Sequence, residues 1–154
     1  MKKTLIPLIL IALVFSCAEK DDFQSYKRLK NQEWLSQDTI NFNFFINDTL
    51  SNYNLFFNLR HTLNYEYRNL FLFVHTEEST DTIEVMLSDK KGKWYGKGVG
   101  DIREIQTKIK TIKYNKRAKH RVTLEQAMRY GEKEKIESLK NIDAVGIMII
   151  KTDE

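Results

Sequence analysis

The chain has 154 residues, enough for one domain, and 42% of them are hydrophobic and 12% aromatic. This composition supplies the apolar surface of a packed core, and the single proline argues against long disordered linkers. The formal net charge is +4, and it is +2 without Lys2 and Lys3, which lie in the predicted export signal described next; this is too small to indicate a nucleic-acid-binding protein. A lone cysteine excludes an internal disulfide, so stability must come from the core.

The first sixteen residues have the organisation of a cleaved export signal. Lys2 and Lys3 form a positive n-region, and an apolar stretch follows from Leu5 to Phe15. That stretch is shorter than the roughly 20 apolar residues that a membrane-spanning helix needs. Cleavage would remove two lysines, so the formal net charge would fall from +4 to +2.

Cys17 follows this segment directly, and Leu13-Val14-Phe15-Ser16-Cys17 resembles a bacterial lipobox. In a lipobox the cysteine thiol is diacylated, and the new amino group is usually acylated after cleavage. Each buried methylene contributes about 0.8 kcal/mol, so two or three chains would hold the protein on a membrane. The alternative is an ordinary export signal in which Cys17 is incidental. We expect a signal peptide over residues 1–16 and a lipidated N-terminus and tether over residues 17–37.

The residues after the cysteine bear on localisation. Ala18 beside Cys17 resembles lipoproteins sorted to the outer membrane, and Lys20-Asp21-Asp22 resembles the charged export tag of Bacteroidota surface lipoproteins. A solvated tether explains the same residues equally well. The sequence therefore predicts a lipid-anchored protein of the cell envelope, at the outer membrane, and leaves open whether it faces the periplasm or the cell surface.

Most of the remaining chain has the side-chain pattern of β-strands. Apolar and polar residues alternate over residues 39–46, 52–60 and 82–88. Residues 70–75 and 144–150 are apolar on both faces, which predicts strands in sheets covered on both sides. Residues 105–114 and 120–124 are predicted as further strands, although the isoleucine spacing of the former also suits a helix. The link 62–69 is too short for a helical crossover and favours antiparallel neighbours.

A short helix is also predicted, because Thr123-Leu124-Glu125-Gln126 has the form of a capping box and Gly131 offers a stop. Together the elements predict an all-β fold: an antiparallel β-sandwich of jelly-roll or Greek-key type over residues 38–154, with one short helix. The mostly polar stretch 23–37 is expected to be a tether that docks through its aromatic side chains.

Catalytic constellations are missing from the sequence. His61, His75 and His120 are scattered, without cysteine or carboxylate at metal-ligand spacing. The carboxylates of residues 77–84 cluster at a predicted turn, where solvation explains them. We expect no enzymatic activity, no metal and no cofactor apart from the covalent lipid on Cys17.

The loop Asp89–Asp101 is rich in glycine and carries the candidate interaction residues Trp94, Tyr95, Lys93 and Lys97. Aromatic faces with polar edges suit stacking on a sugar ring or insertion at a membrane interface. The alternative is that Trp94 folds back into the core. Because the glycines open no predicted helix, a phosphate-binding loop is not indicated.

Two weaker surface features also have structural explanations. Basic residues recur from Lys108 to Arg121 and suit binding to anionic lipid or polysaccharide. A simpler explanation is an edge strand whose lysines prevent pairing with the strand of another molecule. Three Asp-Thr dipeptides match the short O-glycosylation pattern of Bacteroidota envelope proteins, with Thr39, Thr49 and Thr82 as acceptors. Each dipeptide also has the chemistry of a turn leading into a strand.

Taken in order, these segments resemble the GldH family of gliding-motility lipoproteins of Bacteroidota. The resemblance covers nearly the whole chain and includes the lipobox at Cys17, Trp34, Asp38-Thr39-Ile40-Asn41-Phe42, Leu59-Arg60, residues 65–74, Asp81-Thr82-Ile83-Glu84, residues 92–98, Gly100-Asp101-Ile102, residues 124–129 and residues 142–146. Departures from the family pattern are Glu66 in place of proline, Phe71 in place of tryptophan, and Ala118 and His120 in place of glycine and tyrosine.

The resemblance implies an envelope lipoprotein that serves gliding as a non-enzymatic component, associated with type IX secretion. Its partners would be the membrane, through the lipid anchor, and other gliding and secretion proteins of the envelope. From the residues alone, a second hypothesis remains open: a carbohydrate-binding β-sandwich module on a lipid anchor that uses Trp94 and Tyr95.

Overall fold

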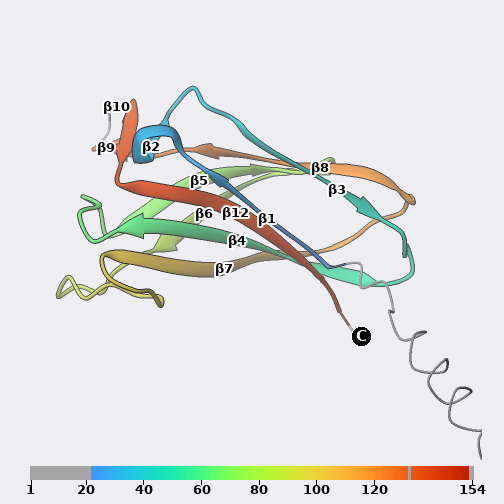
Figure 1. The fold of residues 1–154 in the computed structure, drawn as a ribbon. Coiled ribbons are helices and arrows are strands. Elements are labelled where there is room, and N and C mark those ends of the chain that lie inside the picture. The colour runs from blue at the N-terminus through green and yellow to red at the C-terminus, as the bar shows by residue number, and fades with distance from the viewer. Residues whose placement is uncertain (1–21, 132, 153–154) are drawn as a thin grey trace, which may run out of the picture.

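The computed structural model describes residues 22–131 and 133–152, and they form two stacked antiparallel sheets (Figure 1). The first sheet has four strands in the order β1 (Phe23–Arg28), β12 (Ile142–Lys151), β4 (Asn52–Thr62) and β7 (Ile102–Lys113). The second has the order β3 (Ile40–Ile46), β8 (Ala118–Gln126), β5 (Asn69–His75) and β6 (Thr80–Met86). This alternation of strands between two sheets is a jelly roll, so the predicted sandwich is confirmed.

Two small strand pairs complete the described fold. β2 (Glu33–Leu35) pairs with β11 (Ser138–Lys140), and β9 (Arg129–Tyr130) pairs with β10 (Lys133–Lys135). A single 3-10 turn, η2 (Lys30–Gln32), separates β1 from β2.

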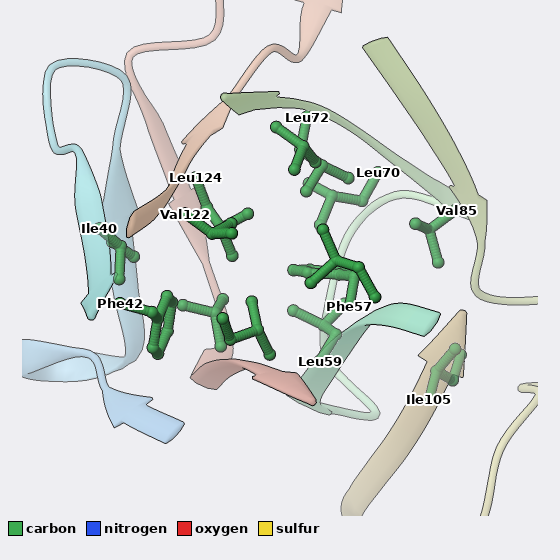
Figure 2. Packing of buried hydrophobic residues seen from close by; sticks show 14 of the residues in the cluster. Ile40, Phe42, Phe57, Leu59, Leu70, Leu72, Val85, Ile105, Val122 and Leu124 are labelled. Atoms are coloured by element: carbon green, nitrogen blue, oxygen red, sulfur yellow. The ribbon is translucent and has the colours of Figure 1, made fainter. Parts of the chain in front are cut away.

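The core lies between the sheets and follows from the alternation of apolar side chains. On β4 the inward residues Tyr53, Leu55, Phe57 and Leu59 are buried. Figure 2 shows side chains from both sheets, among them Phe57 and Leu124, directed toward a common centre. Full burial of such a side chain contributes about 1.5–3 kcal/mol, which makes this layer the main source of stability.

The segment expected to be a tether is largely part of the sandwich. β1 is hydrogen-bonded along β12 from Phe23↔Ile149 to Arg28↔Ala144. Trp34 on β2 is fully buried, and its Nε1 donates to the Asp38 carbonyl at 3.2 Å. Within the described residues the sandwich therefore includes the segment from Phe23 onward and does not start at residue 38, because aromatic residues that were expected to dock a tether lie in the strands themselves.

The predicted helix at residues 124–130 is wrong. β8 continues through Gln126, and a short strand follows at Arg129. The Thr123 hydroxyl donates to the Asn41 side chain at 2.6 Å instead of capping a helix. Pairing along β3 and β5 thus overrides a local capping signal.

Two details of strand placement also differ from expectation. β4 and β5 do not pair, because the link between them crosses from one sheet to the other. β5 is also not covered on both sides: Phe71 and Phe73 point to the outer face of the second sheet and are half-buried. The short link 62–69 instead crosses from the first sheet to the second, and Tyr65 within it is buried.

The strands give the sandwich two distinct ends. We call one of them the near end: it is the end of the sandwich that holds the beginning of β1 and the end of β12 (Figure 1). The far end holds the glycine-rich loop, because the loop leads into Ile102, which pairs with Thr62 at the end of β4. With 11 residues in β4, the two ends are roughly 35 Å apart.

Candidate interaction site in the glycine-rich loop

The glycine-rich loop is held against β7 by backbone hydrogen bonds. The Lys97 N–H donates to the Glu104 carbonyl at 3.1 Å, and the Glu104 N–H donates to the Lys97 carbonyl at 2.7 Å. Before them, the Asp89 carboxylate accepts the N–H groups of Lys91 and Lys93 at 2.8 and 2.9 Å. The loop is therefore an ordered structure with its own turn chemistry.

Two of its glycines are required by the close approach to β7. A Cβ at Gly96 would lie 2.2 Å from the Glu104 carbonyl oxygen, and one at Gly98 would lie 1.8 Å from the Ile102 carbonyl oxygen. Gly96 also has a φ of 81°, in the left-handed region. Only a chain without side chains at these positions can lie so close to the strand.

Trp94 is partly buried and packs against the core. Its ring centroid lies 4.8 Å from that of His61. His61 is itself fully buried, and burial lowers its pKa although the Thr62 carbonyl accepts from its ring at 2.9 Å and works in the opposite direction. The structure thus supports the interpretation of Trp94 as a core residue.

Tyr95, by contrast, borders an open groove between the loop and β7. Its side chain is 47% exposed, and Lys93 and Lys97 are exposed as well. The groove has a volume of about 710 Å³. Its lining consists of Tyr95, Gly96, Lys97, Gly98, Glu104, Ile105 and Gln106.

The Glu104 carboxylate in this groove is fixed from two other strands. The Tyr26 hydroxyl of β1 donates to it at 2.6 Å, and the Arg60 Nε of β4 donates to it at 2.7 Å. The Arg60 guanidinium also lies 4.3 Å from the centre of the Tyr26 ring. Burial acts to raise the pKa of Glu104, but the two hydrogen bonds outweigh it and lower the pKa, so the group is anionic at neutral pH.

Gln106 is held in a similar way. Its Nε2 donates to the Asn58 Oδ1 at 2.9 Å. Asn58 is fully buried under the outer face of the first sheet, and its Nδ2 has no hydrogen-bond partner within the described residues. A buried amide left partly unsatisfied costs stability.

Sequence reasoning found Tyr95, Lys93 and Lys97 but missed Tyr26, Arg60 and Glu104 as one cluster. Alternation on β7 indicates that Glu104 and Gln106 share a face. Nothing local in the sequence says that Tyr26 and Arg60 lie beside them, because these contacts span 78 and 44 positions.

The candidate glycosylation sites lie apart from this groove. Thr39 and Thr82 are exposed, and Thr49 is half-buried. The Asp81 carboxylate is 2.6 Å from the Lys110 Nζ, which lowers the pKa of Asp81. Asp48 accepts from the Leu50 N–H at 2.8 Å in its turn. Cys17 and the signal segment lie outside the described residues.

Among the residues that the structure describes, the remaining candidate histidines lie apart from one another. His61 lies toward the far end, while His120 contacts Glu77 at 3.0 Å near the other end. No three His, Cys, Asp or Glu side chains are placed to share a metal ion in residues 22–131 and 133–152. No helix within that part of the chain is long and apolar enough to cross a membrane.

Comparison with known proteins agrees with the features seen along the chain. The family model described as GldH lipoprotein matches residues 21–149. A protein named gliding motility lipoprotein GldH homolog from Christiangramia forsetii is 33% identical over 150 residues, which cover 93% of this chain and 91% of the relative. The gliding motility lipoprotein GldH of Flavobacterium johnsoniae is 33% identical over 160 residues and 99% of both chains. The chain therefore belongs to the GldH lipoprotein family.

Proposed function

We propose that the protein is a lipid-anchored, non-enzymatic component of the gliding machinery, associated with type IX secretion. The observation that carries this proposal is similarity over 99% of both chains to a relative named gliding motility lipoprotein. The fold is compatible with the role, because a jelly roll presents its loops at the ends of a rigid sandwich.

The proposed anchor is Cys17, in the outer membrane of the cell envelope. Asp22, where the described structure begins, is only five positions after Cys17, with four residues between them. An extended chain of that length spans at most about 18 Å. The anchor would therefore hold the near end close to the membrane and direct the far end, with the glycine-rich loop, toward other envelope proteins.

Deletion of the gene in its own bacterium tests the role. We expect loss of colony spreading, or of type IX protein export where the bacterium does not glide, and restoration by the parent gene. Cys17→Ser should fail to restore either function, because the protein would lose its acyl chains. A deletion strain that spreads and exports normally would contradict the proposal.

The Asp-Thr motifs give a separate prediction about modification. If they are glycosylated, Thr39 and Thr82 should carry the sugar, because both are exposed, and Thr49 should carry less, because it is half-buried. Intact-mass measurement of protein purified from its own membranes would show the added sugar. Peptide mapping of Thr39→Ala and Thr82→Ala would identify the acceptor. An unmodified mass for the mature lipidated chain would reject the prediction.

A further inference from the structure

We propose that the groove between the glycine-rich loop and β7 binds a neutral saccharide. The role in gliding proposed above assigns no ligand to this groove, and the present inference does not depend on that role. It rests on the side chains that line the groove, on the contacts that hold them, and on the charges of the lining residues.

Tyr95 supplies the aromatic surface that a sugar ring needs. Its side chain is about half exposed, while Trp94 next to it packs against the core. Its backbone N–H donates to the Leu87 carbonyl at 2.8 Å, which fixes the base of the side chain. A partly exposed aromatic ring on an ordered backbone can stack on the C–H face of a sugar with little loss of conformational entropy.

Polar groups of three kinds stand around this ring in the same groove. Glu104 offers carboxylate oxygens, Gln106 an amide and Lys97 an ammonium group. Such groups accept from and donate to neighbouring hydroxyls, and an apolar face with a few fixed polar groups is the usual make-up of a small-molecule site. The groove is open and about 710 Å³ in volume, large enough for more than one sugar unit.

Two of these polar groups, Glu104 and Gln106, are already ordered in the protein. Glu104 is oriented by Tyr26 and Arg60, and Gln106 by the buried Asn58. Since Gln106 donates to Asn58 through Nε2, its side-chain carbonyl oxygen is not used in that hydrogen bond. Preorganisation of this kind lowers the entropy lost on binding.

The groove favours a saccharide over an extended peptide. A peptide would add to the edge of β7 through backbone hydrogen bonds, but at Glu104 both backbone groups are already bonded to Lys97. At this position a ligand must therefore bind through side chains of the lining. The lining holds a single cation, Lys97, and a single anion, Glu104, so it offers an acidic polymer no cluster of positive charges, which favours a neutral ligand.

Isothermal titration calorimetry of the detergent-solubilised mature protein tests this proposal. The probes are neutral hexasaccharides of β-1,4-linked glucose, α-1,4-linked glucose, β-1,4-linked mannose and β-1,4-linked xylose, with oligoalginate as the acidic comparison. We expect binding of at least one neutral probe. Tyr95→Ala should weaken that binding by about tenfold or more, the equivalent of about 1.4 kcal/mol, and Tyr95→Trp should retain it.

Phe45→Ala is the matched control, because Phe45 is 53% exposed on the outer face of the other sheet. It should change the affinity by less than about twofold, within ordinary variation for a residue outside the site. Thermal unfolding of each variant verifies that the fold is intact. Absence of binding to all four neutral probes, equal binding by Tyr95→Ala, or binding of oligoalginate alone would overturn the proposal, and none of these results bears on the deletion test of the role in gliding.

Discussion

At the scale of single residues, Glu104 shows how three strands contribute to one surface group. It lies on β7, takes a hydrogen bond from Tyr26 on β1, and pairs with Arg60 on β4. Each bond is charge-assisted and short, yet the side chains of Arg60 and Glu104 are 37% and 38% exposed, so solvent screens the pair. The cluster contributes more to orientation than to stability.

Glu104→Gln should reduce the free energy of unfolding by only about 1 kcal/mol at pH 7, because water screens much of the interaction. Since the folded protein lowers the pKa of Glu104 below its ordinary value of 4.5, its contribution is present above that pH and is lost as the pH falls through the folded pKa. Urea titrations at pH 7 and in acid measure both effects. Glu66→Gln, an exposed carboxylate, is the control; an equal loss in both variants would contradict the assignment.

His61 gives a pH dependence near neutrality. Burial holds the pKa of this histidine below its ordinary value of 6.5, so near that pH the unfolded chain binds a proton that the folded chain does not. Stability should be constant above about pH 6.5 and decrease as the pH falls below it. Urea unfolding between pH 8 and 5 should show this slope in the parent, and the slope should be shallower in His61→Gln. A parent with the same stability at pH 7 and pH 5.5 would exclude this account.

At the scale of elements, the glycine-rich loop contains glycines that are required for two different physical reasons. Gly92 has a φ of 82°, and a Cβ added there would meet nothing within 4 Å, so only the backbone conformation requires it. Gly98 is constrained by contact, because a Cβ would meet the Ile102 carbonyl oxygen at 1.8 Å. Substitutions at Gly92 and Gly98 therefore test the two reasons separately.

Gly92→Ala should cost about 1 kcal/mol from backbone strain and leave the loop in place. Gly98→Ala should displace the loop from β7, because the contact is with backbone that cannot move aside. Amide hydrogen exchange should then show faster exchange at Lys97 and Glu104 in Gly98→Ala only. Protection of these amides in both variants would show that the loop adapts without leaving the strand.

Local sequence patterns predicted which segments are strands better than they predicted which strands pair with each other. Alternation identified β3, β4 and β6, because a strand with one buried face carries that signal within its own residues. The pairing of Phe23 with Ile149 carries no such signal, since the two residues lie more than a hundred positions apart in the sequence. The same limit explains why two interpretations of Trp94 stayed open: its burial depends on His61, which belongs to another strand.

The candidate site was predictable to a similar degree. The loop, Tyr95 and the flanking lysines stand out in the sequence as one short stretch. The groove does not, because the sequence pattern places Tyr26 in a tether and Arg60 on the outer face of a separate strand. Only the order of strands in the first sheet brings the two beside Glu104.

At the scale of the whole molecule, the N-terminal strands are part of the folding unit. β1 covers one edge of β12, and Trp34 fills the core at β2. Loss of a buried tryptophan alone costs about 3–5 kcal/mol, against a total of about 5–15 kcal/mol for a domain.

A chain of residues 38–154 should therefore fail to fold cooperatively, whereas residues 22–154 should unfold in one transition. Circular dichroism during thermal unfolding and the dispersion of amide NMR signals would distinguish the two chains. A cooperative transition in the shorter chain would show that β1 and β2 are accessory to the sandwich.

The direction of β1 has a mechanical consequence for the attachment at Cys17 proposed above. Its first residue lies at the near end, and the strand runs from there toward the far end, antiparallel to β12. A pull between the anchor and a load on the far end would act along β1, at right angles to its hydrogen bonds. All the bonds from Phe23 to Arg28 would then share the force in shear instead of opening one after another. This attachment geometry suits a protein that must stay folded under tension.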